Sequence, residues 1–173
     1  MISWSQPRVA FEQKNRPSII LLTRQGLPVL DRNEYASAEN FRKGGYIISD
    51  CELTPEIIIF ATGSEVWLAL DAKKQLSDYN IRVVNLGCWE LFDDQDEEYK
   101  ASILGTGDSL LVSIEAGVTQ GWEGFTGRNG LNLGINTFGE SAPGKEVADH
   151  FGLNLEQIVL KIKEKMSMRQ PAH

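Results

Sequence analysis

The chain has 173 residues, 42% of them hydrophobic, which is enough for one well-buried domain and argues against disorder as the main state. Its formal charge of -7, from 24 acidic and 17 basic residues without a clustered basic stripe, disfavours a nucleic-acid partner. Because no apolar run approaches the roughly 20 residues needed to cross a bilayer and residues 1–7 lack a signal-peptide pattern, we expect a cytoplasmic protein without a membrane partner.

The N-terminal part predicts one helix and one strand. The helix is expected from Gln6 to Lys14. Ser18 to Thr23 contains an uninterrupted apolar run after a proline, which is typical of a parallel strand buried on both faces. A parallel strand needs neighbours, and only one helix precedes it. We therefore expect a strand that is cut from its sheet.

A second unit is expected after a connector. Asp31 to Lys43 is polar with room for a short helix, and it ends at the dipeptide Gly44-Gly45. The segments beyond it alternate strand and helix patterns, which predicts an α/β sheet. The five expected strands are Tyr46–Ile48, Ile57–Phe60, Ile81–Leu86, Leu110–Ile114 and Leu131–Thr137.

Two helices of this unit have clear apolar faces. The first, interrupted by Lys73, presents Val66, Ala69, Leu70, Ala72 and Leu76. The last presents Leu155, Ile158, Val159, Ile162 and Met166. Gly152 is expected to end the preceding helix, and Asn154 with Gln157 resembles a capping box. The tail, residues 167–173, has no periodicity and is expected to fray.

The run Thr137–Pro143 predicts a corner between the fifth strand and a helix. Gly139 breaks the strand pattern. Ser141 suits a helix cap, and Pro143 suits the first helical positions, where a missing N–H is not felt.

The segment Ala61–Val66 joins a buried strand to a helix, where open parallel sheets place anion sites. Thr62 and Glu65 are also spaced as a capping box, which would leave no free amides for a phosphate. Both interpretations stay open, with capping the simpler one.

Two further segments match no standard ligand-binding pattern. The glycine-rich stretch Gly117–Gly130 lacks both phosphate-loop signatures, so packing by Trp122 and Phe125 is favoured over phosphate binding. The acidic run Asp93–Glu98 lacks the ligand order of a calcium loop, and a carboxylate-rich helix N-terminus is favoured instead.

The cysteines and histidines indicate no reactive site. Cys51 and Cys88 lie far apart without a metal or redox spacing, so reduced, partly buried thiols are expected. His150 has no triad partner in view, and His173 is terminal, so neither receives a catalytic role.

Arg24 is the candidate ligand-binding residue. It follows the apolar run of the expected N-terminal strand, at the carboxyl end where α/β proteins bind ligands. A guanidinium there can bind a phosphate through two hydrogen bonds. From the residues alone, a surface salt bridge, for instance to Asp31, is the simpler explanation.

Several segments in order resemble the transketolase family over nearly the whole chain. They are Leu22–Gln25 with Leu27-Pro28, Gly44–Tyr46, Pro55-Glu56 leading to Ala61–Val66, Phe92-Asp93 with Gln95 and Tyr99, Glu115–Gly117, and Thr137–Pro143. The glycine-rich stretch around Trp122 departs from the aromatic helical segment usual in that family.

The resemblance implies a division of the chain. Residues 1–32 correspond to a remnant of the pyrimidine-binding domain, 33–44 to a linker, 45–166 to the complete C-terminal domain and 167–173 to a tail. The implied fold is a three-layer α/β sandwich with a mixed, mostly parallel five-stranded sheet.

The resemblance also implies the function of the full-length protein, which is transfer of a two-carbon ketol unit between sugar phosphates. That enzyme uses thiamine diphosphate with Mg²⁺ or Ca²⁺ and is a homodimer, and Arg24 matches the arginine that grips the sugar phosphate. This chain has no catalytic, cofactor or metal residue of the family, so on its own it is expected to be inactive, with the remaining transketolase domains as its partners. The alternatives are a stand-alone small-molecule-binding or interaction domain, and the C-terminal part of a related enzyme such as deoxyxylulose-phosphate synthase.

Overall fold

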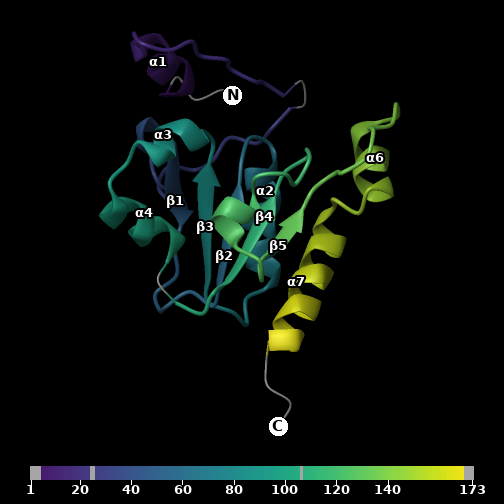
Figure 1. Ribbon diagram of the computed structural model, residues 1–173. Coiled ribbons are helices and arrows are strands. Elements are labelled where there is room, and N and C mark those ends of the chain that lie inside the picture. Colours follow the sequence, from purple (N-terminus) through teal and green to yellow (C-terminus); the bar gives the residue numbers. More distant parts are fainter. Residues whose placement is uncertain (1–4, 24–25, 106, 170–173) are drawn as a thin grey trace.

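The computed structural model describes residues 5–23, 26–105 and 107–169, and it contains a five-stranded sheet between helices (Figure 1). The strands are β1 (Gly45–Ser49), β2 (Ile57–Ala61), β3 (Ile81–Leu86), β4 (Leu110–Ile114) and β5 (Leu131–Leu133). Their order is β1-β3-β2-β4-β5, with β1 antiparallel to β3 and the other neighbours parallel. This confirms the mixed, mostly parallel α/β sheet that the resemblance implied.

Helices cover both faces because the central strands are apolar on both sides. All of β2 is buried, with Ile57 and Ile59 facing one cluster of core residues and Ile58 and Phe60 facing the other. The first cluster includes residues of α2 (Glu65–Gln75) and α7 (Leu155–Arg169). The second includes residues of α3 (Trp89–Asp93) and α4 (Glu97–Leu104), with α5 (Glu123–Thr126) beside them.

The two amphipathic helices form as predicted. The expected apolar residues of α2 are buried, and those of α7 are buried except for the half-buried Leu155. Gly152 has a φ of 63° after α6 (Gly144–His150), a conformation that favours glycine. Asn154 Oδ1 accepts a hydrogen bond from the backbone N–H of Gln157 at 2.9 Å, which confirms the predicted cap. No helix among the described residues is long and apolar enough to cross a membrane.

The N-terminal helix α1 (Ser5–Glu12) is docked on the 3₁₀ helix η1 (Ala38–Lys43). The Arg42 guanidinium donates to both carboxylate oxygens of Glu12, at 2.7 and 3.0 Å, and Val9 is buried. Arg16, just after the helix, pairs with Asp94 of the domain. The helix predicted at Gln6–Lys14 forms as α1 and ends two residues earlier than expected, and the short helix predicted within Asp31–Lys43 forms as η1.

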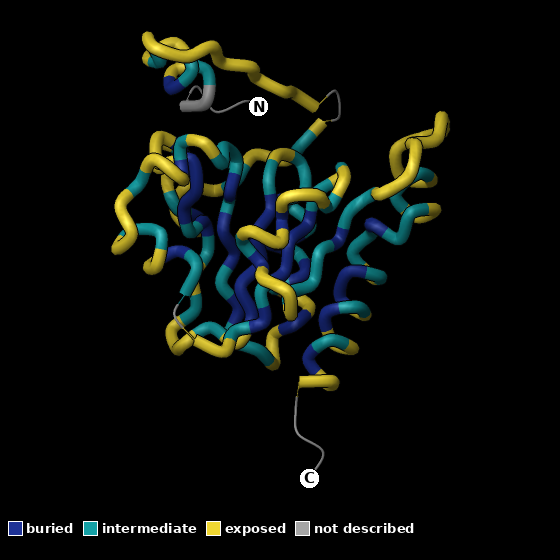
Figure 2. Tube along the Cα trace, in the orientation of Figure 1, coloured by how far each residue is buried: buried dark blue, intermediate teal, exposed yellow. Residues whose placement is uncertain are grey.

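The strand predicted at Ser18–Thr23 is wrong for this chain. The structure assigns no strand to these residues, and Ile19 and Leu21 are 87% and 90% exposed. A strand with two apolar faces requires a sheet between two helical layers. The segment instead crosses beyond the carboxyl ends of the parallel strands and lies open along its length (Figures 1 and 2).

The fifth strand is shorter than predicted, and the run Thr137–Pro143 is a loop. β5 pairs with β4, which ends at Ile114 opposite Leu133, and beyond it the backbone N–H of Ile135 donates to the Gly117 carbonyl of a loop at 2.7 Å. Helix α6 begins at Gly144 with Pro143 as its N-cap and without a side-chain capping hydrogen bond. The predicted Ser141 cap is therefore wrong, because the helix begins too late for that side chain to reach it.

Candidate functional site

The carboxyl ends of β2 and β4 are the expected ligand edge of this sheet. From β2 the chain passes through α2 to β3 on one side, whereas from β4 it passes through α5 to β5 on the other. The loops diverge at this point, and open α/β sheets bind ligands where such a divergence leaves a crevice.

The predicted phosphate-binding residue, Arg24, lies outside the described residues. The chain makes a contact with later parts of the protein before Arg24, at Arg16, and another after it, at Pro28. On the N-terminal side Arg16 pairs with Asp94, and on the C-terminal side the indole N–H of Trp67 donates to the Pro28 carbonyl at 3.2 Å. The chain between these two contacts is therefore attached to the domain at both ends.

The corner at Ala61–Val66 is not closed by the predicted capping box. Gly63 has a φ of 57°, and the N-cap of α2 is Ser64, whose side chain makes no capping hydrogen bond. Ser64 Oγ instead donates to Glu65 Oε1 at 2.7 Å. Glu65 thus places a carboxylate in the first turn of α2, where it interacts favourably with the helix dipole.

The glycine-rich segment packs aromatic rings, which confirms the prediction for Trp122 and Phe125. The Trp122 side chain is fully buried and lies edge-on to Trp89 with 5.0 Å between ring centroids. Its indole N–H donates to Glu115 Oε2 at 2.7 Å. Glu115 lies at the ligand edge, but its carboxylate already serves this buried N–H, so it has a structural role.

The acidic run forms a helix N-terminus, as favoured from the sequence. Asp96 Oδ1 accepts the backbone N–H of Tyr99 at 2.7 Å, and Glu97 and Glu98 lie in the first turn of α4. Across residues 5–23, 26–105 and 107–169, no three His, Cys, Asp or Glu side chains are placed to hold a metal ion.

The thiols are free and partly buried, as expected. Burial raises the pKa of both Cys51 and Cys88, so both stay protonated at neutral pH. His150 is exposed at the end of α6, where its ring packs edge-on against Phe151. His173 lies outside the described residues.

A partly buried polar pair near the ligand edge was not predicted. Asn85, at the carboxyl end of β3, donates through Nδ2 to the Tyr46 hydroxyl at 3.4 Å. Burial raises the pKa of Tyr46, which keeps its hydroxyl neutral. Both residues sit in apolar strand patterns, so the only available signal was a polar residue at an otherwise buried position.

Comparison with known proteins assigns this architecture to a family. Residues 44–154 match the family model described as transketolase-like TK C-terminal domain. The transketolase of Aquifex aeolicus (strain VF5) is 45% identical over 159 residues, which cover 91% of this chain but 23% of that protein.

Two solved structures share the fold and the sequence pattern. A mutant of the Pichia stipitis transketolase has a TM-score of 0.87 and 34% identity, covering 96% of this chain and 24% of that one. The same enzyme in complex with sedoheptulose 7-phosphate has a TM-score of 0.85 and 35% identity, with 95% and 23% covered. The chain thus spans about a quarter of the length of the relatives it matches.

Proposed function

Because the chain belongs to the transketolase-like C-terminal domain family, we propose that it is the C-terminal part of a transketolase. The complete enzyme then transfers a two-carbon ketol unit from a ketose phosphate to an aldose phosphate. The observation that carries the proposal is the coverage, since 91% of this chain matches 23% of a transketolase.

We propose that this chain alone is inactive. The thiamine diphosphate and its divalent cation would belong to the polypeptide that this chain does not include. Calorimetry with thiamine diphosphate and Mg²⁺ tests this directly. We expect no saturable heat from the isolated chain, and tight binding would contradict the proposal.

We propose that residues 1–32 complete the preceding domain of that enzyme, that 33–44 link the domains, and that 167–173 form a tail. The exposed apolar side chains of Ile19 and Leu21 support this division, because they match a buried strand whose sheet is absent from the chain. The family match beginning at residue 44 supports the domain boundary.

We propose that Arg24 binds the phosphate of the sugar substrate. Its position after the apolar run and the attachment of the surrounding chain through Arg16 and Trp67 support this role. Binding a remote phosphate would hold the substrate in place without taking part in bond making. The sedoheptulose 7-phosphate complex of the Pichia stipitis enzyme shows that a relative binds this class of ligand.

A chimera tests the proposed transketolase function and the proposed role of Arg24. The C-terminal region of the Aquifex aeolicus transketolase is replaced by this chain, and two-carbon transfer from xylulose 5-phosphate is measured. We expect activity, and a folded but inactive chimera would contradict the proposed function.

In the chimera, Arg24→Gln should raise KM for a phosphorylated donor about tenfold to a hundredfold, because hydrogen bonds to charged groups contribute about 1.5–3 kcal/mol. An unphosphorylated ketol donor is the control, and equal losses on both donors would make Arg24 structural.

We further propose that the complete enzyme is a cytoplasmic homodimer of the pentose phosphate pathway. The homology to transketolases supports this assignment. Light scattering on the chimera should give the mass of two chains, whereas a monomeric active chimera would contradict the dimer.

A further inference from the structure

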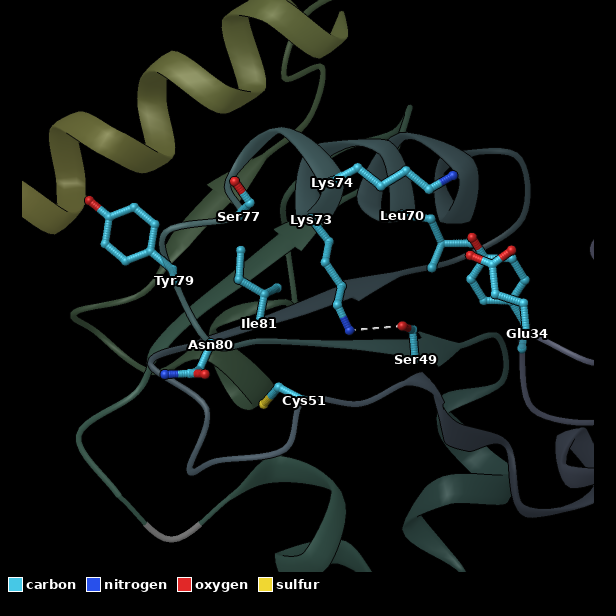
Figure 3. Close-up of a pocket in the computed structure, with 11 residues that line it drawn as sticks. Glu34, Ser49, Cys51, Leu70, Lys73, Lys74, Ser77, Tyr79, Asn80 and Ile81 are labelled. Atoms are coloured by element: carbon cyan, nitrogen blue, oxygen red, sulfur yellow. Dashed lines mark hydrogen bonds between the residues drawn. The ribbon is translucent and has the colours of Figure 1, made fainter.

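A cavity of about 290 Å³ lies beside the C-terminal half of α2, and Figure 3 shows Lys73 reaching across it. Ser49, at the end of β1, and Ile81, at the start of β3, both line it. Because β1 is antiparallel to β3, these residues lie at the opposite end of the sheet from the ligand edge. The cavity is therefore separate from the ligand edge at the carboxyl ends of β2 and β4.

The Lys73 ammonium has only neutral acceptors. Its Nζ donates to Ser49 Oγ at 2.8 Å and to the Asp50 carbonyl at 2.5 Å. The nearby Asp50 carboxylate is bound instead by the Arg82 guanidinium, at 2.9 and 3.1 Å. Among the described residues Lys73 forms no ion pair, although an ammonium carries three protons.

The Asp50 carboxylate therefore faces two cations, the Arg82 guanidinium that it binds and the nearby Lys73 ammonium, which leaves an excess of positive charge at the cavity. Burial lowers the pKa of Lys73, which reflects the cost of holding the charge against the apolar side chains of Leu70 and Ile81. Burial also raises the pKa of Cys51, so this lining thiol stays neutral and would not repel an anion. Of the other charged residues that line the cavity, Lys74 pairs with Asp71 at 3.6 Å, and Glu34 is exposed.

We propose that this cavity binds a phosphate group, as the free ion or as part of a small metabolite, with the Lys73 ammonium as its counter-ion. The hydroxyls of Ser49 and Ser77 add donors that suit phosphate oxygens. The volume is several times that of the ion, which leaves room for a short carbon chain. The site does not depend on the proposed transketolase function.

The test is a titration of the isotopically labelled chain with inorganic phosphate at constant ionic strength, followed by amide chemical shifts. We expect saturable shifts at Asp50, Cys51 and Ser77. Lys73→Gln should weaken binding at least tenfold, whereas Lys73→Arg, which keeps the charge, should retain most of it. Lys163→Gln, which removes an exposed lysine of α7, is the matched control and should change nothing.

A second arm with glycerol 3-phosphate identifies the source of the phosphate. Tighter binding than inorganic phosphate would indicate a phosphorylated metabolite, and equal or weaker binding would indicate the free ion. The wild-type shifts locate the site even if Lys73→Gln fails to fold.

Arg24→Gln separates the two phosphate proposals. If shifts around Asp50 persist in Arg24→Gln and vanish in Lys73→Gln, the cavity site holds whatever the outcome for Arg24. If binding is lost only in Arg24→Gln, the cavity proposal is overturned while the proposed function gains support. Absence of saturable shifts at Asp50, Cys51 and Ser77 in the wild-type chain would also overturn the cavity proposal.

Discussion

The region that holds the sheet (residues 45–105 and 107–166) and the N-terminal segment (residues 5–23 and 26–31) both contain many apolar side chains, but the sheet region buries far more of them. In β2 every residue is buried, whereas the run containing Ile19 and Leu21 is exposed. Helix α1 is held by the ion pair of Glu12 with Arg42 of η1, not through a shared sheet. The comparison shows that an apolar run does not by itself predict burial.

The largest expected contrast comes from one substitution made in both regions. Phe60→Ala should lower the free energy of unfolding by about 3–5 kcal/mol, because a fully buried ring leaves a cavity. Phe11→Ala removes a ring that is 85% exposed and should change it by less than about 0.5 kcal/mol. Urea unfolding of both variants measures the difference. Similar losses would show that the segment is part of the cooperative fold.

A smaller contrast concerns two residues predicted to cap helices. Asn154 makes its capping hydrogen bond, whereas Ser141 makes none. Asn154→Ala should destabilise the chain by about 1 kcal/mol, because it removes the hydrogen bond from the Gln157 amide. Ser141→Ala alters an exposed loop side chain and should leave stability unchanged within error. Thermal unfolding compares them, and a loss at Ser141 would mean that it does cap α6.

The smallest effect is the pH dependence of α1 docking. Hydrogen bonds first from Arg42 and then from Arg8 lower the pKa of Glu12 below its ordinary value. Docking is therefore strongest above the pKa of an unfolded glutamate and is lost as the pH falls through the lowered folded value. The methyl signals of the buried Val9 should report this release while signals of β2 stay unchanged.

Glu12→Gln is the control for that titration. The variant keeps the shape of the side chain but cannot titrate, so its Val9 signals should show no transition over the same range. A transition that survives in the variant would assign the release to another group.

Sequence patterns located the five strands and both amphipathic helices because each signal is local or repeats along one element. They missed the early end of β5, since its length depends on where its neighbour β4 stops. The contacts around the ligand edge and the Lys73 cavity were harder to predict. The contact from Trp67 to Pro28 joins residues 39 apart, and the sequence around Trp67 gives no sign of it. Lys73 did leave a signal, as the one charge on the otherwise apolar face of α2, but only the structure shows the cavity behind it.

We propose that the exposed residues 19–22 pack against a surface supplied by the rest of the complete enzyme. Amide hydrogen exchange, measured on the isolated chain and on the chimera, tests it most directly. We predict that residues 19–22 exchange freely in the isolated chain and become protected in the chimera, while β2 is protected in both. Protection of residues 19–22 in the isolated chain, or free exchange in a folded chimera, would contradict the account.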